Sequence, residues 1–194
     1  MDNPVNALVY RSGHRMAALA LAVFAVCSTL GLAGCSTAAP SNVTAVEDFE
    51  IERYLGTWHE IARLDHRFER GLTKVTATYS RRDDGGVRVI NRGYDEAADE
   101  WKQAEGRAYF RGDPTIGSLK VSFFGPFYGG YHIFALDHPD YEWALVSGQR
   151  RDYLWILARS PHLDRAITAK LVDKARAAGF AVDELIWLSQ ESKP

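Results

Sequence analysis

Lys74-Val75-Thr76-Ala77-Thr78-Tyr79 alternates polar and apolar side chains, and the turn sequence Arg82-Asp83-Asp84-Gly85-Gly86 follows it. A period of two predicts a β-strand with one buried face. Asp-Gly is a strong turn signal between antiparallel strands. Because a second strand-like segment, 87–94, comes directly after the turn, the stretch predicts a β-hairpin. We expect the rest of the fold to be built from units of this kind.

Short strand-like segments recur on both sides of this hairpin, and turns that carry Gly, Asp or Pro separate them. The expected strands are 54–64, 74–79, 87–94, 101–110, 119–123, 131–136, 143–147 and 153–159. Eight strands joined in succession by short turns predict an all-β fold, the antiparallel up-and-down barrel, because closure removes exposed strand edges.

One amphipathic helix is expected after the eighth strand. Ser160 is a suitable N-cap, Pro161 fits the first helical position, and Gly179 is a suitable stop. The apolar stripe of this helix consists of Leu163, Ile167, Leu171 and Ala175. Since segment 153–157 is apolar on both faces, we expect the helix to pack there on the outside of the barrel. Residues 180–188 then predict a short ninth strand.

The first 34 residues predict an export signal. Arg11, His14 and Arg15 precede an apolar run, 16–32, that is shorter than the roughly 20 residues of a membrane-spanning helix. Small residues follow the run, as at a signal cleavage site.

Leu32-Ala33-Gly34-Cys35 is similar to the bacterial lipobox, and a chance match is the alternative. The motif implies that Cys35 receives a diacylglyceryl group and becomes the N-terminus. Ser36, rather than an aspartate, implies anchoring in the outer membrane. Residues 35–47 are small and polar and predict a flexible, lipidated tether. The remaining domain is expected at 48–190.

Cysteine content, charge and histidine spacing exclude several classes of protein. The only two cysteines are Cys27 and Cys35, so the domain holds no disulfide, cysteine nucleophile or thiolate metal site. The net charge of −2 is well mixed along the chain, which argues against a nucleic-acid partner. The six histidines lack metal-ligand spacing, and neither a metal nor another cofactor is expected.

The predicted order of eight strands, a helix and a ninth strand resembles that of the lipocalin family. Gly56-Thr57-Trp58 is similar to the family's Gly-x-Trp motif, and Arg159 is similar to the arginine of its third motif. Asp140 and Tyr141 resemble part of the second motif, in which Pro139 replaces a threonine. The resemblance implies that Trp58 plugs the closed end of the barrel with Arg159 across its ring.

The stretches 54–58, 65–72 and 121–131 resemble bacterial members of the family, and the likeness extends over residues 48–189. It implies a periplasm-facing carrier or store of fatty acids (palmitate among them) or lysophospholipids that serves membrane maintenance. It also implies a homodimer.

The barrel interior is expected to bind the ligand. If Trp58 faces inward, strand alternation sends Glu60 and Ala62 inward as well. The expected contacts with the ligand are Glu60, Ala62, Val121, Phe123, Phe127, Tyr128, Tyr131, Ile133, Trp143 and Leu145. Small residues such as Ala77 leave space, which favours a cavity over a filled core. A buried Glu60 would repel a free carboxylate, which favours a lysophospholipid. A pigment, haem or quinone is the alternative cargo.

The open rim is expected to consist of loops 65–72, 95–100, 124–130 and 148–152. Aromatic side chains and nearby arginines in these loops have three open interpretations: contact with lipid or gating, packing against a second copy, and local packing.

Catalysis is the less favoured interpretation. His59 and Glu60 are neighbours on a strand and point to opposite faces. Asp137-His138 is expected at the closed end, and Asp65-His66 at the mouth lacks a nucleophile. We therefore predict no catalytic residue, and a lipid-modifying enzyme stays as an alternative.

Overall fold

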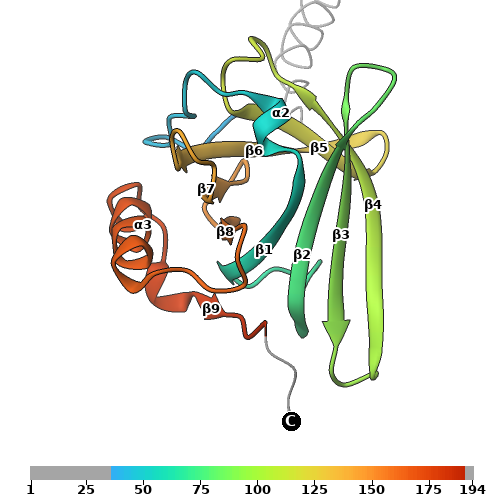
Figure 1. Cartoon of the computed structure of the whole chain (residues 1–194), viewed down its shortest axis with the longest axis vertical. Coiled ribbons are helices and arrows are strands. Elements are labelled where there is room, and N and C mark those ends of the chain that lie inside the picture. Colours follow the sequence, from blue (N-terminus) through green and yellow to red (C-terminus); the bar gives the residue numbers. More distant parts are fainter. Residues whose placement is uncertain (1–35, 191–194) are drawn as a thin grey trace, which may run out of the picture. The chain divides into compact units, whose positions relative to one another are not determined.

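The computed structural model of the protein describes residues 36–190, and the predicted signal and Cys35 lie outside this range. Nine strands form one sheet in the order β2-β3-β4-β5-β6-β7-β8-β1-β9, and pairing of β1 with β2 closes it into a barrel (Figure 1). The strands are β1 Gly56–Arg63, β2 Leu72–Arg81, β3 Val87–Asp95, β4 Glu100–Phe110, β5 Ser118–Phe124, β6 Phe127–Leu136, β7 Trp143–Ser147, β8 Leu154–Ala158 and β9 Ile186–Trp187. The predicted antiparallel barrel of eight strands is confirmed.

Helices occur at both ends of the barrel sequence. A single turn, α2 (Ile51–Tyr54), precedes β1, and α3 (Arg165–Ala177) follows β8. A 3₁₀ turn, Val182–Glu184, leads into β9. Within residues 36–190, no helix combines the length and apolar character needed to cross a bilayer.

Helix α3 begins later than Ser160 and Pro161 predict. Asp164 is the N-cap, and its carboxylate accepts hydrogen bonds from the backbone N–H groups of Ala166 (2.8 Å) and Ile167 (3.2 Å). A carboxylate satisfies two free N–H groups and also meets the positive end of the helix dipole, whereas the Ser160 hydroxyl accepts only from His162 N–H. The stop is confirmed, because Gly179 follows the helix in the left-handed region at φ +88°.

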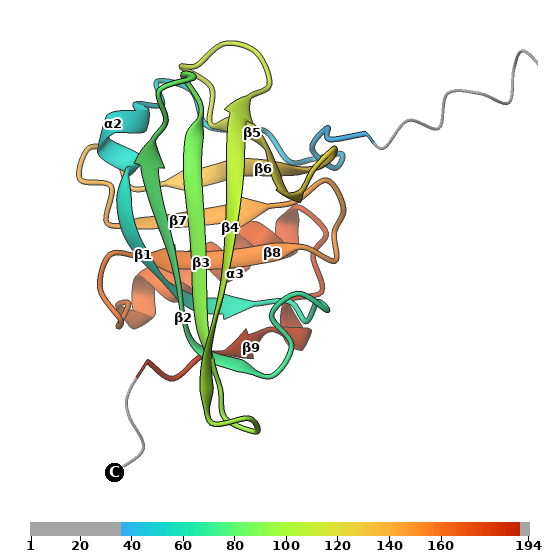
Figure 2. The ribbon, with the colours of Figure 1, turned by 90° about the vertical axis from the view of Figure 1, so that its right-hand side faces the viewer.

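Two apolar clusters lie on opposite sides of the barrel wall. The inner cluster contains Trp58, Val146 and Leu157. The outer cluster joins Leu154 and Ile156 of β8 to the apolar stripe of α3, where Leu171 and Ala175 are fully buried. Figure 2 shows α3 behind β7 and β8. The barrel thus has an outer face covered by the helix and an interior that side chains fill only in part.

The segment expected to be a flexible tether packs against the barrel over much of its length. Val46 N–H donates to Ile133 O (2.8 Å), and Gly117 N–H donates to Val46 O (2.9 Å). Val43 is buried in the outer cluster. Two valines and these backbone bonds hold a segment whose other residues are small or polar, which composition alone does not indicate.

Candidate ligand-binding site

One end of the barrel is sealed by the tryptophan of the Gly-x-Trp motif. Trp58 has no exposed surface, and its indole N–H donates to Tyr54 O (2.8 Å). The guanidinium carbon of Arg159 lies 4.0 Å from the Trp58 ring centroid. Arg159 also donates to Arg53 O (2.7 Å) and Thr57 O (3.1 Å). The cation–π contact and the backbone bonds together close this end.

The other predicted closed-end residues differ in whether they contact the closed end of the barrel. Gly56 has φ +96°, and a Cβ there would lie 3.3 Å from Arg159 Nη1, so glycine suits both the backbone and the contact. Tyr141 is buried, and its hydroxyl accepts from Glu50 N–H (3.0 Å). Asp140 is exposed at the surface. Four of the five motif residues therefore meet at this end.

A cavity of about 780 Å³, counted to its opening, lies above the Trp58 plug. That volume includes the solvent space at the open mouth of the cavity. Its apolar wall comes from most strands and consists of Val75, Ala77, Val87, Val89, Ala108, Leu119, Val121, Phe123 and Leu157. Small side chains, Ala77 and Ala108 among them, leave the space that the ligand prediction requires.

The structure places four of the predicted contact residues on the cavity wall: Glu60, Val121, Phe123 and Tyr131. Ile133 points into the barrel but packs in the inner cluster outside the cavity wall. Phe127 and Tyr128 lie on the rim and do not line the cavity.

Three further predicted contacts, Ala62, Trp143 and Leu145, lie outside the barrel in the cluster under α3. A β-bulge is the reason for Ala62, whereas β7 alternates without a break and has the opposite parity to the one expected. The bulge between Glu60 and Ala62 reverses the alternation of β1, and another between Ile133 and Ala135 does so in β6. Across β6 and β7, Ala135 pairs with Leu145 on the outer face. The inward residues of β7 are Ala144 and Val146.

Three tyrosine hydroxyls form a chain at the closed end of the cavity. Tyr131 Oη lies 2.7 Å from Tyr54 Oη and 2.8 Å from Tyr79 Oη. Burial raises the pKa of each of the three hydroxyls, so all stay protonated at neutral pH. Two of the three protons serve the contacts within the chain, and the third is available to a polar group in the cavity.

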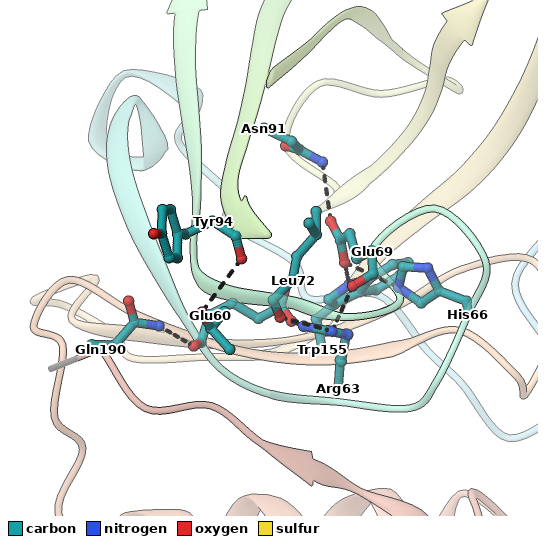
Figure 3. Close-up of polar contacts among 10 residues, drawn as sticks. Glu60, Arg63, His66, Glu69, Leu72, Asn91, Tyr94, Trp155 and Gln190 are labelled. Carbon is teal, nitrogen blue, oxygen red and sulfur yellow. Dashed lines mark hydrogen bonds and ion pairs between the residues drawn. The ribbon is translucent and has the colours of Figure 1, made fainter. Parts of the chain in front are cut away.

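A charged network lies on the cavity wall toward the open end (Figure 3). Arg63 Nη1 donates to Glu60 Oε1 (2.7 Å), and both side chains are at most 4% exposed. Arg63 Nη2 donates to the backbone oxygens of Glu69 (2.7 Å) and Leu72 (3.1 Å). Arg63 therefore ties strand β1 to the loop that leads into β2.

The Glu69 carboxylate connects this network to three other elements. Its Oε2 accepts from the Trp155 indole N–H (3.1 Å) and lies 3.1 Å from His66 Nε2. Its Oε1 accepts from Asn91 Nδ2 (3.4 Å). Burial acts to raise the pKa of Glu69, but the close His66 ring and the bond from Trp155 outweigh it and hold that pKa below its usual range.

Glu60 has the opposite electrostatic character. Burial and the nearby charge of Glu69 raise the pKa of Glu60 well above its ordinary value, although Arg63 acts against the shift. Glu60, Glu69 and Asn91 line the cavity, whereas Arg63 and His66 do not. The surface that faces the ligand thus offers the acceptor oxygens of Glu69 and Asn91, together with a Glu60 carboxyl group whose protonated form burial favours.

Sequence reasoning identified only Glu60 in this network. Arg63, Glu69 and Asn91 were missed, although a charged residue inside the apolar run Ile61-Ala62-Arg63-Leu64 is a usable signal of a buried ion pair. Asp65 and His66 were considered together, but Asp65 pairs with Arg70 (2.8 Å) and His66 with Glu69. Within residues 36–190, no cluster of three or more His, Cys, Asp or Glu is arranged for a metal ion.

A second hollow adjoins the cavity at the open end. It shares Glu69, Asn91 and Phe123 with the cavity, and Arg92 and Lys102 line its outer part. The route from solvent to the apolar lumen therefore passes first two cations and then the acceptor groups.

Known proteins with similar sequences and structures support this architecture. The family profile of the lipocalin-like domain matches residues 49–190. The outer membrane lipoprotein Blc of Escherichia coli K12 is 54% identical over 175 residues, which cover 90% of this chain and 98% of the relative. The protein of the same name from Citrobacter freundii is 54% identical over 169 residues, covering 87% and 95%. Insecticyanin of the tobacco hornworm Manduca sexta, a solved structure, has a TM-score of 0.64 at 20% identity and covers 80% of this chain and 88% of its own.

Proposed function

The chain belongs to the lipocalin family, and on this basis we propose that it is a membrane-anchored lipid-binding protein. Its cargo is a fatty acid or a lysophospholipid, which it stores or transports for maintenance of the outer membrane. The proposal includes a diacylglyceryl anchor on Cys35 and a domain that faces the periplasm. The relatives named outer membrane lipoproteins support the location.

The apolar lumen suits a single acyl chain. Each buried methylene group contributes about 0.8 kcal/mol, so a chain of about sixteen carbons gains about 12 kcal/mol relative to water. A bilayer offers the same chain a similar gain. Selectivity must therefore come from the polar groups at the two ends of the cavity.

The charged network favours a lysophospholipid over a free fatty acid. Arg63 pairs with the Glu60 carboxyl group and donates only to the backbone oxygen of Glu69, and Asn91 Oδ1 has no hydrogen-bond partner within residues 36–190. An acceptor surface of this kind suits a glycerol hydroxyl and opposes a carboxylate. Arg92, farther out, is placed to attract a phosphate, whereas Lys102 beside it is paired with Asp95 (2.5 Å).

The observation that carries the proposal is the apolar cavity with acceptor groups at its open end. The test is lipid mass spectrometry on the full-length protein extracted from its own membrane in mild detergent. We expect one monoacyl lipid per chain, with lysophospholipid in excess of free fatty acid. Protein that releases no acyl lipid would contradict the proposal.

Pigment, haem or quinone carriage is the alternative that the same preparation tests. No histidine is among the residues that line the cavity in the described chain, which disfavours haem. A lipid carrier is colourless, so a visible absorption band that co-purifies with the protein would favour this alternative.

A further inference from the structure

The open rim carries three exposed phenylalanines. Phe124 and Phe127 face each other at the tip of the β5–β6 hairpin, where they are 69% and 72% exposed. Phe68, on the loop between β1 and β2, is 55% exposed and lines the same mouth hollow as Phe123. Large apolar side chains gathered on one rim mark a contact surface more often than scattered ones do.

Unpaired cations accompany these rings. Lys120 Nζ lies 5.1 Å from the ring centroid of Tyr128, next to Phe127. Arg107 reaches the hairpin tip, where its Nη2 lies 2.9 Å from the position that a Cβ on Gly125 would take. Within residues 36–190, neither cation forms an ion pair with a carboxylate. Aromatic rings flanked by free cations match the interface of a phospholipid layer, whose phosphates lie above its acyl chains.

The N-terminal segment is fixed to the barrel on the side of this rim. Thr37 O accepts from His132 Nε2 (3.0 Å), and Thr37 Oγ1 accepts from Arg111 Nε (3.0 Å). Arg151 donates to Ser41 O (2.6 Å) from the loop between β7 and β8. The tether therefore does not leave the domain at Phe49, close to the closed end, but follows the wall toward the rim (Figure 2).

Thr37 lies against strand β6 a short distance from the tip of the β5–β6 hairpin. Its carbonyl oxygen lies 2.7 Å from the position that a Cβ on Gly130 would take. Gly130 follows Phe127 by three positions along β6, which is about 10 Å at the rise of a strand. Cys35 precedes Thr37 by two residues, which span at most about 7 Å. The described residues thus begin, at Ser36 and Thr37, within reach of the rim.

We propose that the open rim of the barrel docks on the phospholipid layer that holds the anchor, with Phe124 and Phe127 inserted among the lipids. The inference rests on the proposed lipidation of Cys35. Arg111, His132 and Arg151 set the orientation, because they fix the tether beside the mouth. Cargo then passes between bilayer and cavity without crossing open water.

The test uses the full-length, lipidated protein in vesicles of phosphatidylethanolamine and phosphatidylglycerol. Cys27 lies in the predicted signal and the Cys35 thiol is alkylated, so an introduced cysteine is the one site for a fluorescent label. Phe127→Cys reports on the rim, and Asp83→Cys, in the exposed β2–β3 turn, is the matched control at the closed end. Quenching by nitroxide-labelled lipids is measured for both.

We expect several-fold stronger quenching at position 127 than at position 83, and a blue-shifted emission at position 127 only. In the same vesicles, adding Arg111→Gln and His132→Gln to the labelled Phe127→Cys protein should reduce the quenching, because the tether is then released from the wall. Circular dichroism of each variant checks that the barrel is intact.

Equal quenching at the two positions would overturn the proposal. So would energy transfer between labels on two copies at position 127 without lipid quenching, since a second copy would then cover the tip. Displacement of a fluorescent fatty acid from the same vesicle-bound protein measures cargo binding separately. Cargo binding without rim quenching contradicts docking alone, rim quenching without cargo binding contradicts the proposed function alone, and failure to float with the vesicles contradicts both.

Discussion

At the scale of single residues, two carboxyl groups on the cavity wall have different partners: Glu60 pairs with Arg63, and the Glu69 carboxylate lies against His66, Trp155 and Asn91. Glu69 is held ionised by His66 and Trp155, whereas burial makes ionisation of Glu60 costly. The two groups lie in the same network but have pKa shifts of opposite sign. This difference follows from the number of donors around each carboxylate, since the one side-chain donor to Glu60 is Arg63.

The shifts predict opposite pH dependences for two matched substitutions. The folded protein binds the Glu60 proton more tightly than the unfolded chain does. The stabilisation from protonated Glu60 is therefore complete below the ordinary carboxyl pKa and is lost as the pH rises through the raised pKa. Glu60→Gln avoids this loss, so its free energy of unfolding relative to the wild type should increase from acid to neutral pH.

Glu69→Gln is the control with the reverse sign. The pKa of Glu69 is lowered, so its stabilisation is present above the ordinary carboxyl pKa and is lost as the pH falls. Urea unfolding across the pH range measures both variants. If the free energies of unfolding of the two variants relative to the wild type do not change with pH, or change in the same direction, the opposite pKa shifts of Glu60 and Glu69 are contradicted.

The closed-end plug gives a second prediction at this scale. Trp58→Ala should lower the free energy of unfolding by about 3–5 kcal/mol, as deletion of a large buried aromatic does. Trp187→Ala, at a ring that is 53% exposed, is the matched control and should cost within about 0.5 kcal/mol. An unchanged melting curve for Trp58→Ala would show that this ring is not the plug.

At the scale of elements, the start of α3 and the β5–β6 hairpin show how short local features position larger parts. Helix α3 covers the outer face of β8 only because it starts at the right place, and Asp164 sets that start. The hairpin exposes two phenylalanines because its pairing is interrupted between Val121 and the Phe124–Phe127 pair at its tip.

Substitution at the helix start tests the corrected N-cap. Asp164→Ala should destabilise the protein by about 1 kcal/mol, since two backbone N–H groups lose their acceptor. Ser160→Ala should be nearly neutral, because Ser160 does not cap α3. Thermal unfolding compares the two variants. A larger loss of stability for Ser160→Ala than for Asp164→Ala would indicate that the helix begins at Ser160.

The hairpin tip predicts an effect on rate rather than on stability. Phe127→Ser should slow the uptake of a fluorescent lysophospholipid from vesicles, because the rim loses an apolar contact with the lipid layer. The melting temperature should change little, as the ring is exposed. Stopped-flow fluorescence measures the rate of lipid transfer. A rate equal to that of the wild type would show that Phe127 does not contribute to lipid uptake.

At the scale of the whole molecule, the tether is bound to the barrel beside its open end, and in the proposal this links the position of the anchor to that of the mouth. The tether is bound along the wall by contacts from β6, from the segment after β4 and from the β7–β8 loop. Burial lowers the pKa of His132 to about 4. The ring is therefore neutral at physiological pH, where Nε2–H donates to Thr37 O and Nδ1 accepts from the Ser118 hydroxyl.

Removal of the anchor tests this arrangement in the cell. Cys35→Ala should give a protein that is unprocessed or released from the membrane, whereas Cys27→Ala should leave it anchored. Membrane fractionation followed by mass spectrometry of the N-terminus distinguishes these forms. A Cys35→Ala protein that still fractionates as a processed outer-membrane lipoprotein would contradict lipidation.

The sequence by itself determined the number and order of the strands, the helix after them and the closed-end residues Trp58 and Arg159. Each of these depends on local signals: alternation with a period of two, turn residues between strands, and motifs of a few residues. For the same reason the inward face of β2 was predictable, since Val75, Ala77 and Tyr79 alternate without a break.

Only the tertiary structure decided which residues face the ligand on β1, β6 and β7. On β1 and β6 a bulge shifts the alternation by one residue, and its position depends on the partner strands rather than on the strand itself. On β7 the alternation is unbroken, and only the packing of the barrel decides which face is inward. The charged network was equally hidden, because Glu69 and its donor Trp155 are 86 residues apart. The path of the tether was not predictable either, because Thr37 contacts His132 of β6, a residue 95 positions away in the sequence, and the two meet only in the folded barrel.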